Sequence, residues 1–76
     1  MDDLTLKDRA VLSVLRDKNW MSCADIRDVS NFDLSVADVG VSIAVLLERK
    51  LVRRKRGDRQ LYRLTEEGVR RRNRCG

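Results

Sequence analysis

Residues Leu51–Thr65 read LVRRKRGDRQLYRLT. Apolar and polar residues alternate in two short runs, Leu51–Arg54 and Leu61–Leu64, on either side of a charged loop with Gly57 at its tip. Such alternation around a glycine-containing turn is typical of an antiparallel β-hairpin, in which Gly57 would supply the backbone freedom of a tight turn. Because the hairpin carries six basic side chains and only one acidic side chain, we expect it to bind a polyanion. The basic side chains are Arg53, Arg54, Lys55, Arg56, Arg59 and Arg63.

Length and composition fit one small domain. The chain has 76 residues, of which 42% are hydrophobic, so it can bury one modest core. We expect a single domain over 1–76, with its core at about 5–70 and a basic tail at 71–76. No apolar run approaches the ~20 residues of a membrane span, and no secretory signal is recognisable, so we expect a cytoplasmic protein.

The residue types exclude several kinds of chemistry. The chain has no histidine, and its two cysteines, Cys23 and Cys75, are far apart, so no zinc site is expected. A disulfide between them is not favoured, because nothing indicates an oxidising compartment. Without a histidine, a glycine-rich phosphate loop or paired carboxylates, the sequence predicts neither an enzyme nor a cofactor.

Charge is divided unevenly along the chain. Residues 1–48 hold five basic and nine acidic side chains, a net charge of −4, whereas residues 49–76 hold twelve basic and three acidic ones, a net charge of +9. One part of the surface should therefore attract polyanions, and nucleic acid is the expected partner.

Helix starts are marked by a Ser or Thr that is followed three residues later by Asp. The hydroxyl can accept the amide at the third helical position, where the helix dipole also favours a negative charge. Together with apolar spacing, these signals predict helices over 6–17, 23–29 and 36–49, a brief extended segment at 19–21, and a short last helix after Thr65. The three signals are Thr5 with Asp8, Ser22 with Asp25, and Ser35 with Asp38. The expected core contacts are Ala10, Val11, Val14, Leu15, Ala24, Ile26, Val29, Val39, Ile43, Leu46 and Leu47.

The sequence resembles a known family along most of its length. Residues 34–64 read LSVADVGVSIAVLLERKLVRRKRGDRQLYRL, and LTEEG ends at residue 68. This resembles the capped recognition helix, the "LVRR" strand, the charged wing and the exit helix of bacterial MarR-like and PadR-like regulators. The resemblance implies an α+β winged helix-turn-helix fold with a three-helix core, a two- or three-stranded β-wing and a short C-terminal helix. It also implies a small transcriptional regulator that binds double-stranded DNA, with stand-alone plasmid or phage regulators as the nearest parallels.

The resemblance assigns roles to three groups of residues. Residues 35–48 would form the recognition helix in the major groove. The wing residues Arg53, Arg54, Lys55, Arg56 and Arg59 would follow the phosphate backbone. Ser22 and Cys23 would offer backbone amides to a phosphate.

The predicted recognition helix carries no Arg, Lys, Asn or Gln before Arg49, although these side chains read guanine and adenine edges. Ala37, Val41 and Ala44 could instead contact thymine methyls, and Ser42 could reach a base edge. The alternative is an adaptor whose apolar helix binds another protein or a second copy of the chain. The candidate reading residues are Ser35, Ala37, Val41, Ser42 and Arg49.

Two further features could support binding. The run with Arg70, Arg71, Arg72 and Arg74 would form either a nucleic-acid arm or a solvated end. Trp20 is expected to pack against the core or the hairpin rather than to stack on a base.

Overall fold

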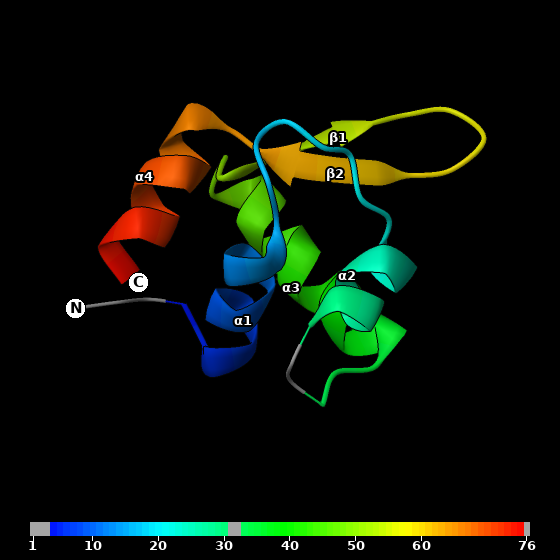
Figure 1. Ribbon diagram of the computed structural model, residues 1–76, viewed down its shortest axis with the longest axis horizontal. Helices are drawn as coiled ribbons and strands as arrows, with labels where there is room; N and C mark the ends of the chain where they lie inside the picture. The colour runs from blue at the N-terminus through cyan, green and yellow to red at the C-terminus, as the bar shows by residue number, and fades with distance from the viewer. Residues whose placement is uncertain (1–3, 31–32, 76) are drawn as a thin grey trace.

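The computed structural model describes residues 4–30 and 33–75, excluding the side chain of Cys75. Three helices form the body, a hairpin lies across one end of them, and a last helix packs beside the first (Figure 1). This arrangement confirms the predicted α+β class. The elements are α1 (Leu6–Val14), α2 (Cys23–Val29), α3 (Val36–Glu48), β1 (Val52–Lys55), β2 (Leu61–Leu64) and α4 (Glu66–Cys75).

The predicted helix starts are all present as capping boxes. At α3, for example, the Asp38 amide donates to Ser35 Oγ at 3.1 Å, and the Asp38 carboxylate accepts the Ser35 amide at 3.3 Å. Thr5 and Ser22 cap α1 and α2 in the same way. Because each box satisfies two amides that a helix end leaves unpaired, these short sequences fix where the helices begin.

Helix α1 is shorter than predicted, because its backbone is already extended at Leu15 (φ −65°, ψ 151°). The chain then runs toward the hairpin, where the Arg16 carbonyl accepts the Leu64 amide at 2.8 Å. Met21 and Tyr62 exchange two backbone hydrogen bonds of 2.9 and 2.8 Å, which form an isolated bridge. The predicted extended segment at 19–21 therefore adds a single bridge to a two-stranded sheet.

The hairpin pairs Val52 with Leu64 and Lys55 with Leu61, which leaves a five-residue loop at 56–60. Its strands match the prediction to within one residue. The expectation for Gly57 was wrong, since no described glycine has a positive φ. A loop of five residues closes the hairpin without the left-handed backbone that a two-residue turn demands.

Helix α3 ends in a left-handed residue, Lys50, with φ 62°. The Lys50 amide donates to the Leu47 carbonyl at 3.0 Å, and the Leu51 amide donates to the Leu46 carbonyl at 2.9 Å. This is the Schellman pairing that ends many helices, usually with glycine at the left-handed position. It turns the chain sharply, so that β1 starts directly beside the end of α3.

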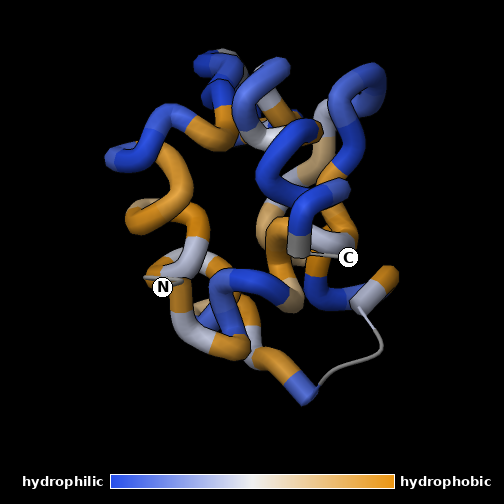
Figure 2. Tube along the Cα trace, turned by 90° about the vertical axis from the view of Figure 1, so that its left-hand side faces the viewer, coloured by the Kyte–Doolittle hydropathy of each residue, from blue (hydrophilic) through white to orange (hydrophobic). Residues whose placement is uncertain are grey.

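The core lies between α1, α3 and the inner face of the hairpin. Most predicted core residues are buried, but Ala24 and Val29 are exposed and Leu47 is only partly buried. Leu12, which we did not predict, is 1% exposed. Figure 2 shows that most of the chain near the C-terminus, which belongs to α4, is hydrophilic. The buried apolar side chains are Leu4, Ala10, Val11, Leu12, Val14, Leu15, Ile26, Leu34, Val39, Ile43, Leu46, Leu51, Val52, Tyr62 and Leu64.

Thr65 joins α4 to the end of α3. Its hydroxyl donates to the Lys50 carbonyl at 2.8 Å and accepts the Gly68 amide at 3.0 Å, so Thr65 caps α4 as predicted. None of the helices formed by the described residues is both long enough and apolar enough to cross a membrane.

Candidate nucleic-acid interface

The strand pleat divides the hairpin cations between two faces. Arg54 is paired with Tyr62, on the same face as the buried pair Val52 and Leu64. Burial raises the pKa of the Tyr62 hydroxyl, and the positive charge of Arg54 opposes this rise. Arg53, Lys55 and Arg63 occupy the opposite, outer face, where Arg53 and Arg63 stand directly across from each other. The hairpin thus presents positive charge on both sides.

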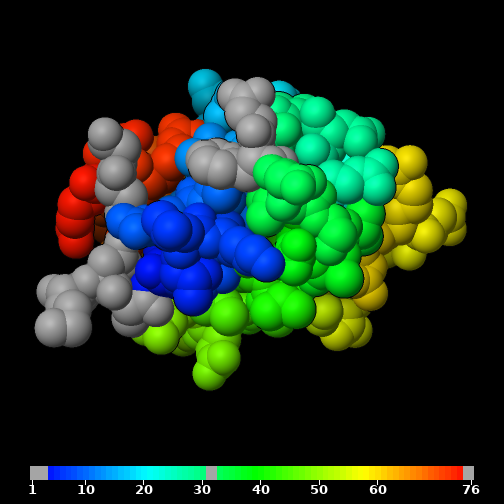
Figure 3. Space-filling view, turned by 90° about the horizontal axis from the view of Figure 1, so that it is seen from below, coloured from blue at the N-terminus to red at the C-terminus, as the bar shows by residue number. Residues whose placement is uncertain are grey.

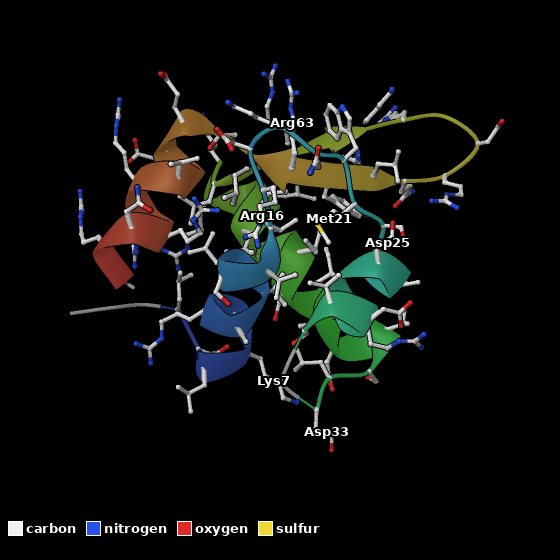
Figure 4. All side chains as sticks on the ribbon, viewed as in Figure 1. Lys7, Arg16, Met21, Asp25, Asp33 and Arg63 are labelled. Carbon is white, nitrogen blue, oxygen red and sulfur yellow. The ribbon has the colours of Figure 1, made fainter. Side chains whose placement is uncertain are left out.

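Most of these cations are not neutralised within the chain. Among residues 4–30 and 33–75, no carboxylate lies within 4.0 Å of the charged groups of Arg53, Arg54, Lys55 or Arg56. Arg59 differs, because its Nη2 lies 3.9 Å from Asp25 Oδ2. Figure 4 shows Asp25 at the start of α2. The unpaired cations are held on a two-stranded element that extends beyond the helices (Figure 1). They are therefore available to an external polyanion.

Trp20 packs on the outer face of the hairpin. The guanidinium carbon of Arg63 lies 4.5 Å from the centroid of the Trp20 ring, and Lys55 Nζ lies 5.8 Å from it. Both distances are in the range of cation–π attraction. The interpretation that Trp20 packs against the hairpin is confirmed, and its ring helps to hold two cations in place.

A row of exposed residues, apolar except for the last, runs along the outer side of α3. Ala37, Val41, Ala44 and Glu48 follow one another at intervals of three or four residues and are all exposed. Val41 is 68% exposed. Figure 3 shows the surface of α3 between those of α1 and the hairpin. The row and the hairpin cations therefore belong to neighbouring parts of the surface.

Ser42, predicted to read a base edge, lies in the core instead. It is 2% exposed and lies on the buried side of α3 with Val39, Ile43 and Leu46. Each residue advances a helix by about 100°, so Ser42 points away from the outward row. This correction removes Ser42 from the candidate site.

Asp38 is also held within the fold. Lys7 Nζ lies 3.2 Å from Asp38 Oδ1 and joins α1 to α3. The Ser35 amide, followed by Lys7, lowers the pKa of the Asp38 carboxyl. Its charge is thus partly compensated, and its oxygens already accept hydrogen bonds. Of the candidates at the two ends of α3, Ser35 serves as the N-cap, whereas Arg49 is the exposed C-cap residue.

The start of α2 fits a phosphate poorly. The Ser22 hydroxyl and amide both bond to Asp25, whose carboxylate adds negative charge at this end. Burial raises the pKa of the Cys23 thiol, and Cys23 packs against the core. We therefore leave Ser22 and Cys23 out of the proposed interface.

The expected basic tail is part of α4, which continues to Cys75. Arg72 Nη1 donates to the Leu15 carbonyl at 3.0 Å and so ties α4 to the end of α1. Arg70 Nη1 lies 3.0 Å from Glu67 Oε2. Arg71 is half-buried and Arg74 is exposed. The basic run therefore lies in the last turns of α4, and one of its arginines, Arg72, bonds to the body.

Three solved structures illustrate what the chain resembles. A protein from Thermoplasma volcanium, described as a possible HxlR family transcriptional factor, is 28% identical with a TM-score of 0.79, over 92% of this chain and 64% of that one. BpsR from Bordetella bronchiseptica, studied for regulation of its DNA binding by 6-hydroxynicotinic acid, is 27% identical with a TM-score of 0.84, over 96% of this chain and 53% of that one. MepR from S. aureus, in a complex with DNA, is 19% identical with a TM-score of 0.79, over 96% of this chain and 62% of that one. At this identity, MepR shows a likeness of fold alone.

The chain spans between about half and two thirds of the length of these proteins. No family model and no curated protein matches it. The shared arrangement of helices and hairpin makes the fold a winged helix-turn-helix, in which α2 and α3 form the helix-turn-helix and the hairpin forms the wing.

Proposed function

We propose that this chain binds double-stranded DNA and acts as a small transcriptional regulator. The observation that carries the proposal is the set of unpaired cations on the wing, Arg53, Arg54, Lys55 and Arg56, beside the outward row of α3. The two neighbours above 25% identity support it, since one is described as a possible transcriptional factor and the other by its DNA binding.

In the proposed complex, the wing cations contact phosphates and α3 lies against the major groove. Arg49 and Lys50, both exposed, stand at the junction of helix and wing, where they would meet the backbone at the edge of the groove. The charge contacts would supply affinity without selecting a sequence.

The finer assignment stays within this proposal. We propose three such assignments. The chain would be a MarR-like or PadR-like regulator, it would pair with a second copy of itself, and it would act at the nucleoid in the cytoplasm. Arg70, Arg71 and Arg74 would add at most a distant contact, because α4 and the wing loop lie at opposite ends of the molecule (Figure 1).

A titration of duplex DNA of random sequence at low and moderate salt tests the function. We expect binding whose log affinity falls linearly with log salt, with a slope of about −0.9 for each phosphate contacted. Fluorescence anisotropy measures the affinity, and circular dichroism confirms that the protein is folded. Absence of duplex binding by folded protein at low salt would contradict the proposal.

A further inference from the structure

The outward row of α3 is apolar and small over most of its length. Ala37, Val41 and Ala44 are exposed, and Val36 beside them is 41% exposed. A side chain added at Gly40 would meet nothing within 4 Å, so the helix backbone is open to close approach there. A ligand for this surface must offer apolar groups at short range.

Polar side chains of α3 do not change this character. Ser42 is buried, and Asp38 is engaged by its own helix start and by Lys7. Only Glu48, at the last turn, adds a hydrogen-bonding group to the row. The helix therefore lacks the bidentate donors and acceptors that distinguish guanine from adenine.

The charged residues near the row indicate which kind of ligand it binds. Arg49 and Lys50 follow its end directly, and the unpaired wing cations lie beyond them. Together they complement a polyanion whose apolar groups lie between two lines of negative charge. The major groove of DNA has this form, because the C5-methyl group of thymine is its apolar feature and phosphates line both edges.

We propose that α3 recognises C5-methyl groups in the major groove, so that the protein prefers thymine-rich duplexes. This inference rests on the proposed function, which places α3 against that groove. Val41 is the central contact because it is the largest apolar side chain of the row and is 68% exposed. Ala37 and Ala44 flank it one helical turn away on either side.

A change of thymine to uracil tests the inference directly. Uracil keeps the pairing, the O4 acceptor and the minor-groove edge of thymine, and lacks only the methyl group. We expect affinity to fall about fourfold for each methyl group that is removed from the interface, as expected for a buried methyl-sized group. In a G·C duplex, replacement of cytosine by 5-methylcytosine adds the same group, and affinity should rise there.

A pair of valine variants locates the contact. Val41→Ser should lower the ratio of affinities for thymine and uracil duplexes below the wild-type ratio, because it removes the central apolar contact of the row. Val29→Ser is the matched control, because Val29 is 55% exposed on α2 and lies outside the row. This control should keep the wild-type ratio. Both positions are exposed, so both variants should fold.

The outcomes separate the inference from the function beneath it. Equal affinity of the wild type for thymine and uracil duplexes, with salt-dependent binding intact, overturns methyl recognition and leaves DNA binding standing. Failure to bind any duplex overturns both. If Val41→Ser lowers the mass in sedimentation and leaves the thymine preference unchanged, the row is a protein interface and the inference is wrong.

Discussion

At Gly68 the close packing of neighbouring atoms leaves no room for a side chain. Gly68 is buried where α4 crosses the end of α3, and a side chain there would collide with the Leu51 carbonyl oxygen and approach Leu64 Cδ2 to 3.0 Å. The Leu51 carbonyl already accepts the Thr65 amide, so it cannot move aside freely. Glycine is required here for close packing rather than for an unusual backbone angle.

Gly68→Ala should therefore destabilise the protein by about 1–3 kcal/mol, as overpacking usually does. Gly40→Ala is its control, because Gly40 is also inside a helix but faces open space. There the better helix propensity of alanine should stabilise by about 0.5–1 kcal/mol. Urea denaturation of both variants measures the two changes. Equal changes of the same sign would show that α4 does not pack closely on Leu51.

Leu46 and Leu47 are neighbours with different surroundings. Leu46 is 0% exposed, whereas Leu47 is partly buried at the margin of the core. Leu46→Ala should cost about 2–5 kcal/mol, and Leu47→Ala should cost clearly less. Thermal or urea denaturation distinguishes them. A larger loss of stability at Leu47 would mean that α3 is rotated from the orientation described.

At the scale of elements, the hairpin combines a buried face with exposed charge. Its inner residues Val52 and Leu64 anchor it to the core, and Trp20 packs on its outer face. The bridge between Met21 and Tyr62 holds its second strand from the other side. This anchoring keeps the cations in a fixed orientation, which lowers the entropic cost of binding a phosphate backbone.

Replacement of Arg54 and Arg56 by alanine should weaken binding to every duplex and make the salt slope shallower by about one unit for each phosphate that the wing no longer contacts. The control replaces Arg27 and Arg70, which removes the same charge from side chains paired with Asp28 and Glu67. Anisotropy titrations at several salt concentrations compare the two. The same slope in both double variants would refute a specific role for the wing.

For the whole molecule, charge is distributed over an elongated body of 37 × 26 × 19 Å. The wing loop and α4, which are both basic, lie at opposite ends of the molecule (Figure 1). Ion pairs join the acidic helices to other elements. Lys7 links α1 to Asp38 of α3, and Arg59 links the wing to Asp25 of α2.

The lowered pKa values of these two carboxyl groups predict how stability depends on pH. Hydrogen bonds from Ser22 lower the pKa of Asp25, and those from Ser35 and then Lys7 lower the pKa of Asp38, from an ordinary value of 3.8. A lowered pKa in the folded state gives stability that is present above the ordinary pKa and lost as the pH falls through the folded value. The thermal midpoint should therefore fall between pH ~5 and pH ~2.

Asp38→Asn checks the cause of this fall. The variant should melt lower than the wild type near pH ~5, and the two curves should converge at acid pH, where the wild-type carboxyl is protonated. Calorimetry across this range measures both midpoints. A constant difference between the two proteins at every pH would contradict the assignment to this carboxyl.

The sequence alone determined the local features of this protein. The capping boxes at Thr5, Ser22 and Ser35 and the hairpin strands depend on residues a few positions apart, so pattern and propensity were sufficient. The charge of the wing could be predicted in the same way. The resemblance of residues 34–64 to winged regulators also predicted the fold correctly.

Only the packing of the elements against one another shows which residues are buried and which are exposed. Ser42 and Val41 are adjacent, yet one is buried and the other exposed, because packing against α1 sets the rotation of α3. The bond from Arg72 to Leu15 and the fit of Gly68 against Leu51 join segments far apart in the chain. Periodicity specifies a helix but not its partner, so contacts between distant segments become known only when the elements pack together.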